Sequence, residues 1–213
     1  MNKALTARQH LYSRYLSVGT IAIIIAISTG CASIAPKNTA ASSSTRNPYQ
    51  EKISINGRLQ VQYQQEGKEQ SLPGNFEWLQ NETDTSINLL SPLGQTIAII
   101  KQDATGASLQ QADHPTKLAA DVDTLVGETL GWPLPLLGMR DWLQGYTRDK
   151  SGRHVAVLAN NSELLTADGW QLRYVSWQET AGQTYPKRID LHRYTTQAGD
   201  VNLRIVMDQW KAP

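Results

Sequence analysis

The sequence predicts a mainly β fold, in which a curved antiparallel sheet of the meander or barrel type carries a short helical insert. Two observations support this prediction. Most of the chain after residue 50 alternates apolar and polar residues with a period of two, which is typical of strands that bury one face. The central stretch 121–145 instead repeats its apolar residues with the period of a helix. We expect the insert to plug or cover one side of the sheet.

The composition is that of one globular domain with appendages. The chain has 213 residues, of which 40% are hydrophobic and 18% charged, and this excludes a disordered chain or a polytopic membrane protein. A single cysteine rules out an intramolecular disulfide. Beyond the first 30 residues the chain has 17 basic and 19 acidic residues. This near-neutral body argues against binding of nucleic acid.

Residues 1–30 have the features of a lipoprotein signal peptide. A polar stretch with three basic residues precedes an apolar run that is too short and interrupted for a transmembrane helix. The small residues that follow resemble a bacterial lipoprotein cleavage box, although Ser28 stands where leucine is usual. We therefore expect Cys31 to be the lipidated first residue of the mature chain, and Ala32 after it points by analogy to the outer membrane.

Residues 31–48 are expected to be the lipidated cysteine and a flexible tether. This segment is rich in Ser, Ala and Thr and poor in large apolar side chains, so it buries too little surface to offset its ordering entropy. The folded domain is expected over residues 49–213.

The clearest strand is expected over residues 53–63, where the apolar positions are all odd and Gly57 is the only gap. Turn signals at 72–74, 92–94 and 105–106 separate the next candidates. Close spacing of strands favours a meander or barrel. The further strands are expected over residues 75–80, 86–90, 96–102, 107–111, 170–174, 189–191 and 201–207.

Two helices are expected in the insert. Asp121 can cap a first helix whose apolar residues recur at helical spacing until Gly131 ends it. A second, shorter helix is expected over residues 136–143, with Gly145 as its stop. The connection is Trp-Pro-Leu-Pro, and we expect the pair to act as a lid or a core filler.

The sequence contains no common catalytic signature. The G-x-S-x-G, H-E-x-x-H, P-loop and G-x-G-x-x-G patterns are all absent. Asp190 and His192 share one strand face, which we expect to be solvated. Asp121 and Asp123 have no third carboxylate at ligand spacing, so an N-cap explains them better than a cation site. We expect no enzyme activity, metal or cofactor.

Three segments resemble the LolB family of outer-membrane lipoprotein receptors: residues 89–96 (LLSPLGQT), 131–136 (GWPLPL) and 140–145 (RDWLQG). The similarity covers nearly the whole mature chain. It implies an unclosed antiparallel β-barrel, or half-barrel, with a helical insert over its apolar concave face. It also implies a monomer, lipid-anchored on the periplasmic side of the outer membrane, that accepts acylated lipoproteins from the carrier LolA and inserts them into the bilayer.

Carrying acyl chains through water requires a sheltered apolar cavity, because each methylene removed from water is worth about 0.8 kcal/mol. Inward strand residues and apolar residues of the insert are the candidates for its wall. They are Leu59, Val61, Tyr63, Trp78, Leu134, Leu137, Trp142, Leu172 and Leu203.

The turn Pro92-Leu93-Gly94 is the second candidate site. A leucine between Pro92 and Gly94 is expected to point outward at a tight turn. The family resemblance implies that Leu93 inserts into the bilayer during the last transfer step.

Two other functions are compatible with the residues. The same half-barrel could belong to a structural or assembly lipoprotein that binds a protein partner, and retention of a hydrophobic ligand would discriminate against it. An envelope hydrolase is the third reading, testable through substitution of His192.

Overall fold

The computed structural model describes residues 45–157, 163–180 and 182–211. Cys31, the signal peptide and most of the expected tether lie outside these residues. The end of that tether, however, forms part of the fold: Thr45–Arg46 (β1) pairs in parallel with Gln183–Thr184 of β12, and Asn47 is buried. The other elements are β2 (Ile53–Gln65), β3 (Lys68–Gln80), β4 (Thr85–Leu90), β5 (Thr96–Asp103), β6 (Gly106–Gln111), β7 (Lys117–Ala119), α2 (Val122–Leu130), α3 (Leu136–Trp142), β8 (Tyr146–Arg148), β9 (His154–Ala156), β10 (Glu163–Leu165), β11 (Gln171–Thr180), β12 (Gln183–Thr195) and β13 (Gly199–Lys211).

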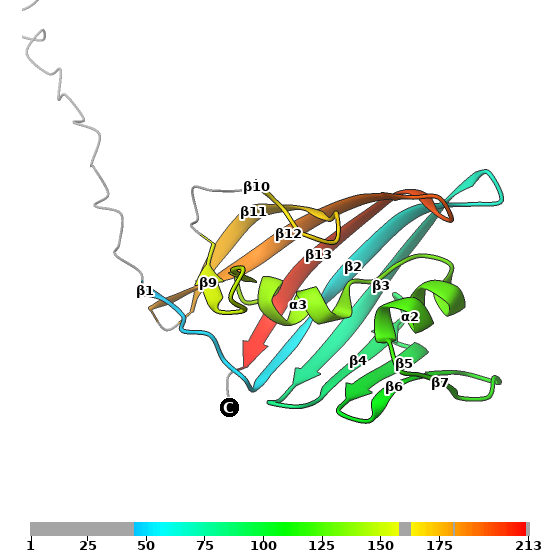
Figure 1. Cartoon of the computed structure of the whole chain (residues 1–213), viewed down its shortest axis with the longest axis horizontal. Coiled ribbons are helices and arrows are strands. Elements are labelled where there is room, and N and C mark those ends of the chain that lie inside the picture. Colours follow the sequence, from blue (N-terminus) through cyan, green and yellow to red (C-terminus); the bar gives the residue numbers. More distant parts are fainter. Residues whose placement is uncertain (1–44, 158–162, 181, 212–213) are drawn as a thin grey trace, which may run out of the picture. The chain divides into compact units, whose positions relative to one another are not determined.

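One antiparallel sheet has the strand order β10-β11-β12-β13-β2-β3-β4-β5-β6-β7, and β1 adds to it beside β12. The strands β10 and β7 end this order and do not pair with each other, so the sheet is curved but unclosed. Figure 1 shows α2 and α3 lying over one face of this sheet. The predicted half-barrel with a helical insert is confirmed.

The strand β3 runs straight through residues 72–74, which the sequence analysis takes as a turn. That expectation is wrong, because the turn is the pair Glu66–Gly67, with φ of 51° and 72°. In the alternation that this two-residue turn sets, Pro73 and its partner Gln60 exchange no hydrogen bonds. The nitrogen of Pro73 therefore faces the β4 side of the strand. Because β4 first pairs with β3 at Asn75, no hydrogen bond of the sheet is lost through the missing N–H of Pro73.

The gap at Gly57 in the apolar face of β2 is filled by a neighbour. Phe76 of β3 pairs with Gly57, and its ring would lie 2.7 Å from a Cβ placed there. On the other side such a Cβ would lie 2.2 Å from the carbonyl oxygen of Val206. The alternation breaks at this position because two neighbouring strands already occupy the space of a side chain.

The first helix of the insert follows its sequence signals. The Asp121 side chain accepts hydrogen bonds from the backbone N–H groups of Asp123 and Thr124, and Gly131 ends the helix with φ of 80°. Both predicted ends of α2 are confirmed. The short strands β1 and β7 to β10 are not predicted, since three residues or fewer carry too little alternation to be recognised.

Gly57→Ala is expected to destabilise the fold strongly, because the new methyl meets a backbone oxygen that cannot move away. We expect a loss above about 2 kcal/mol in the free energy of unfolding, measured with urea. Gly127→Ala is the matched control: it lies within α2 with nothing within 4 Å of a new Cβ. There alanine should stabilise by about 0.5 to 1 kcal/mol, and equal effects at both sites would contradict this account.

Candidate functional site

The concave face of the sheet and the underside of the insert form one apolar cluster. Most of the residues expected to line an acyl cavity belong to it, from strands on both sides of the sheet and from the insert. The buried members are Val61, Tyr63, Trp78, Leu134, Trp142, Leu172 and Leu203. Leu59 is partly buried and packs against them.

Leu137 differs from this set. This residue is 54% exposed and lies at the rim of the insert. A position in the interior is what its place in the predicted cavity wall implies. The reason for its exposure is helical geometry: Leu136 and Met139 share the buried side of α3, and Leu137 is rotated by about 100° from Leu136 around the helix axis. Leu137 instead borders a small crevice between α3 and the strands β4 and β5.

Little space remains between α3 and the strands β4 and β5. The crevice beside Leu137 has a volume of about 10 Å³, which is room for one water molecule at most. Its floor includes Ile87 and Ile100, both buried.

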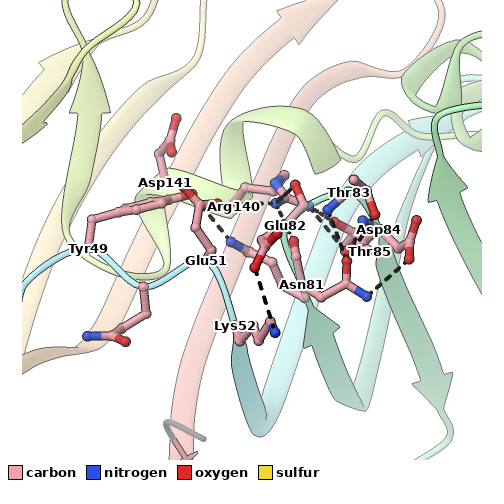
Figure 2. Close-up of polar contacts among 12 residues, drawn as sticks. Tyr49, Glu51, Lys52, Asn81, Glu82, Thr83, Asp84, Thr85, Arg140 and Asp141 are labelled. Atoms are coloured by element: carbon pink, nitrogen blue, oxygen red, sulfur yellow. Dashed lines mark hydrogen bonds and ion pairs between the residues drawn. The ribbon is translucent and has the colours of Figure 1, made fainter.

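One end of the insert is held by polar contacts, and Arg140 of α3 makes the first of them (Figure 2). Its guanidinium donates to the carbonyl oxygens of Asn81 (2.7 Å) and Asp84 (3.2 Å) and to the hydroxyl of Thr85 (2.5 Å). Glu51 lies 4.0 Å away on another side. Arg140 thus fixes α3 to the turn between β3 and β4.

Asp141, the next residue, is buried and holds the hairpin β8–β9. Its carboxylate accepts a hydrogen bond from Arg148 Nε at 2.7 Å and lies 3.0 Å from His154 Nδ1. The Tyr49 ring stacks on His154 with 3.6 Å between ring centroids. The hydrogen bond to Asp141 raises the pKa of the Arg148 guanidinium above its ordinary value.

Gln144 joins the insert to the segment before β2. Its buried side-chain amide accepts from the Gln50 N–H (2.8 Å) and donates to the Gln50 carbonyl (2.9 Å). Nearby, the Tyr146 hydroxyl donates to the Asn47 carbonyl at 2.8 Å. We call residues 45–51 the N-terminal arm. This arm contacts the C-terminal end of the insert through Gln50 and Glu51, and β8 through Asn47.

The α2 end of the insert is held differently. Its buried residues Val122, Leu125 and Val126 pack towards β5, β6 and β7. The Leu136 N–H of α3 donates to Asp123 Oδ1 of α2 at 2.9 Å, and Lys117 Nζ of β7 donates to the hydroxyl of Thr129 at 3.2 Å. Apolar packing therefore dominates on this side, in contrast to the polar anchoring of α3.

Asp123 is also the group whose ionisation is most altered near this site. Its burial raises the pKa of the carboxyl group to about 6, and the nearby Asp121 adds to the effect. The hydrogen bond from Leu136 opposes the shift without cancelling it. The link between the two helices therefore carries a carboxylate that is costly to ionise.

The loop Ser91–Gln95 exposes Leu93 to solvent, and this residue is 90% exposed. The Gly94 N–H bonds the Ser91 carbonyl at 2.9 Å, and Gly94 has φ of 84°. This is a three-residue hairpin loop with its glycine in the left-handed region. The Asn75 side chain donates to the same Ser91 carbonyl, so the base of the loop is fixed while its tip protrudes.

The polar residues flagged in the sequence form no catalytic group. His192 Nε2 lies 3.0 Å from Asp200 and Asp190 binds arginines, so these two do not pair with each other. Within residues 45–157, 163–180 and 182–211, no cluster of His, Cys, Asp and Glu could hold a metal ion. Over the same ranges, no helix is long and apolar enough to cross a membrane.

The arrangement defines the half-barrel class of proteins, in which a curved, unclosed antiparallel sheet buries its apolar face under a helical insert. The family model described as outer membrane lipoprotein LolB matches residues 51–210. The outer-membrane lipoprotein LolB of Ralstonia nicotianae is 34% identical over 93% of this chain and 99% of the relative, and that of Cupriavidus necator is 37% identical over 84% and 88%. The chain belongs to the LolB family. It is accordingly an outer-membrane lipoprotein and not an enzyme.

Among solved structures, a LolA superfamily protein from Nitrosomonas europaea aligns with 81% of this chain and 90% of its own, with 10% identity and a TM-score of 0.43.

The stability of the domain should fall as the pH rises from about 4 to 6, through Asp123. Because folding raises its pKa from 3.8 to about 6, the folded state binds the proton more tightly, and this contribution to stability is lost as pH passes the folded value. Asp123→Asn keeps an acceptor for the Leu136 N–H and removes the titration. Urea unfolding at pH 4 to 7 should give a flatter profile for the variant, and parallel profiles would refute the assignment.

Proposed function

We propose that the chain is the receptor that accepts acylated lipoproteins from a LolA-type carrier and delivers them to the outer membrane. Family membership supports the role of receptor. The observation that carries the mechanism is the asymmetry of the insert, which covers an apolar concave face with one end fastened by polar contacts and the other packed by apolar ones.

In this proposal α2 moves and α3 stays. Arg140, Asp141 and Gln144 hold the α3 end through hydrogen bonds that would have to break together. The α2 end can exchange its contacts with the strands for contacts with an acyl chain, which has the same apolar chemistry. The acyl chain would then lie against β5 to β7 and the residues around Leu134 and Trp142.

The magnitudes are compatible with such an exchange. Exposing the three buried residues of α2 costs about 5 to 9 kcal/mol, at about 1.5 to 3 kcal/mol for each side chain. Sheltering one chain of about 14 methylenes returns about 11 kcal/mol. That gain is counted from water, so transfer from a carrier without ATP requires that this chain holds the acyl chain more tightly than the carrier does.

Leu93 serves the delivery step. A single leucine buried in lipid contributes only about 1.5 to 3 kcal/mol, which is enough to bias a short encounter with the bilayer and too little to anchor the protein. The fixed base of its loop means that insertion of the tip positions the whole domain. The expected lipid on Cys31 supplies the lasting attachment.

The proposal is tested by transfer between purified components. Full-length chain reconstituted in liposomes is mixed with a LolA-type carrier that holds a lipoprotein with a fluorescent acyl chain. Appearance of the lipoprotein in the liposomes should require the chain. Equal transfer without it, or failure of the chain to retain any hydrophobic ligand, would favour a structural lipoprotein instead.

The substitutions Leu136→Ala and Leu137→Ala compare a residue in the interior of the insert with a residue at its rim. Leu136 is buried, so its truncation should cost about 2 to 5 kcal/mol in the free energy of unfolding. Leu137 is exposed, so its truncation should cost less than about 1 kcal/mol. Binding of the fluorescent acyl chain should nevertheless weaken in the Leu137 variant, because the rim is where we expect the chain to enter. Unchanged binding there would remove Leu137 from the acyl path.

Leu93→Glu should leave folding and acceptance from the carrier near normal while release into liposomes falls at least about tenfold, because a carboxylate is excluded from hydrocarbon. Leu79→Glu is the control, since Leu79 is another exposed leucine, 52% exposed on β3 and outside the proposed acyl path. Release measured by flotation should be unaffected in that control. Normal release in the Leu93 variant would show that the loop is only a turn.

A further inference from the structure

A second hollow lies on the outward face of the sheet, away from the insert. It has a volume of about 780 Å³ and spans β10, β11, β12, β13 and β2. Its polar side chains alternate along the strands with the buried leucines of the concave face, so they belong to the opposite side of the sheet. The family resemblance and the proposed transfer role assign nothing to this face.

The strand register aligns the polar residues into two rows across the hollow. In one row Arg173, Asp190, Arg204 and Gln60 are direct cross-strand neighbours. In the next row, about 7 Å along the strands, the neighbours are Gln171, His192, Asn202 and Gln62. The floor therefore presents two guanidiniums beside a row of amide and imidazole groups.

Asp190 holds the arginines in place and is fully occupied by them. Arg188 donates twice to it, at 2.6 and 2.9 Å, and Arg173 and Arg204 donate once each, at 3.1 and 3.3 Å. A carboxylate offers about four acceptor positions, so all are used. One negative charge thus faces three positive charges at this point of the sheet.

The two arginines that line the hollow have donors to spare. A guanidinium carries five N–H donors, and among the described residues Arg173 and Arg204 each give one to Asp190. Their side chains are 55% and 50% exposed, whereas that of Arg188 is 30% exposed and does not line the hollow. Arg188 and Asp190 therefore support a pair of guanidiniums that open into the cavity.

The rest of the lining limits the ligand. Glu163 is the second acid of the hollow and lies opposite Arg173 in the register, where it reduces the positive potential without closing the site. The amides of Gln60, Gln62 and Asn202 offer donors and acceptors suited to hydroxyl groups. The volume exceeds what a bare phosphate or sulfate needs and lies in the range of small-molecule sites.

We propose that this outward hollow binds a phosphorylated polyol, with the phosphate on Arg173 and Arg204 and the hydroxyls on the amide row. Planar guanidiniums match phosphate oxygens in pairs, and the amides complete the recognition. Glycerol phosphate is the simplest group of this chemistry. It occurs as a free metabolite and as the headgroup of an anionic phospholipid.

Binding of sn-glycerol 3-phosphate to the full chain, in an uncharged polyoxyethylene detergent, is measured by calorimetry. We expect saturable 1:1 binding that weakens at least about tenfold in the double variant Arg173→Gln, Arg204→Gln and weakens as salt is raised. Glu163→Gln should bind about two- to threefold more tightly, because it removes a competing charge. Arg58→Gln, which breaks the exposed pair with Asp208 outside the hollow, should bind as the parent does.

Three results would overturn the proposal: no saturable binding by the parent chain, equal affinity in the double variant, or equal binding of uncharged glycerol. The gain expected for Glu163→Gln keeps the test valid should the double variant unfold. Short-chain phosphatidylglycerol distinguishes a lipid headgroup from a free metabolite as the ligand. Binding tighter than that of sn-glycerol 3-phosphate indicates a lipid headgroup, and weaker binding indicates a soluble ligand. Leu93→Glu should not alter either affinity, which separates this site from the delivery loop.

Discussion

The constraint on which the structure depends is that an unclosed sheet cannot bury its own apolar face. A closed barrel fills its interior with side chains from all around its wall, but here β10 and β7 end the strand order without meeting. The exposed half of the interior must therefore be covered by another part of the chain. The stretch of α2 and α3 provides that cover, with Trp132 and Leu134 in its connection both buried. A cover that is separate from the wall can move, and this freedom is what a closed barrel lacks.

The two ends of that cover are attached by different physical means. Polar anchors such as Arg140 on the β3–β4 turn are directional and specific, so they hold only one arrangement. Apolar packing under α2 is non-directional, so any apolar ligand can take its place. The N-terminal arm lies against the polar end, through Gln144 and Tyr146. The segment that leads from the expected lipid anchor is thus tied to the part of the insert that we expect to stay fixed.

The sequence predicts those features whose signals are local. Asp121 and Gly131 bound α2 because capping and left-handed glycine act within a few residues. The long strands are recognisable for the same reason, since alternation is a property of neighbours. Pro73 misleads this reasoning because its tolerance in β3 depends on where β4 ends, which is a property of a different segment.

The candidate site is predictable in its apolar part and not in its polar part. Burial of Val61 or Leu172 follows from alternation, and exposure of Leu93 follows from turn chemistry. The bonds of Gln144 to Gln50 join residues 94 positions apart, and no periodicity reports such a contact. The motif RDWLQG at residues 140–145 is the sequence signal for these contacts. It places three polar residues around a buried tryptophan at the end of a short helix, and polar groups that become buried need hydrogen-bond partners.

The period of two that builds the sheet also divides its chemistry between two faces. Every inward leucine of β11 to β13 has outward neighbours in the chain, and those neighbours are largely charged or amide-bearing. Solubility alone asks only that such residues be polar and dispersed. Three arginines instead surround Asp190, and two of them open into the hollow. This is more than solubility requires, because like charges at such short range oppose folding unless each is compensated. The outward face therefore carries one carboxylate among three guanidiniums, and the proposed ligand would supply the further negative charge that compensates them.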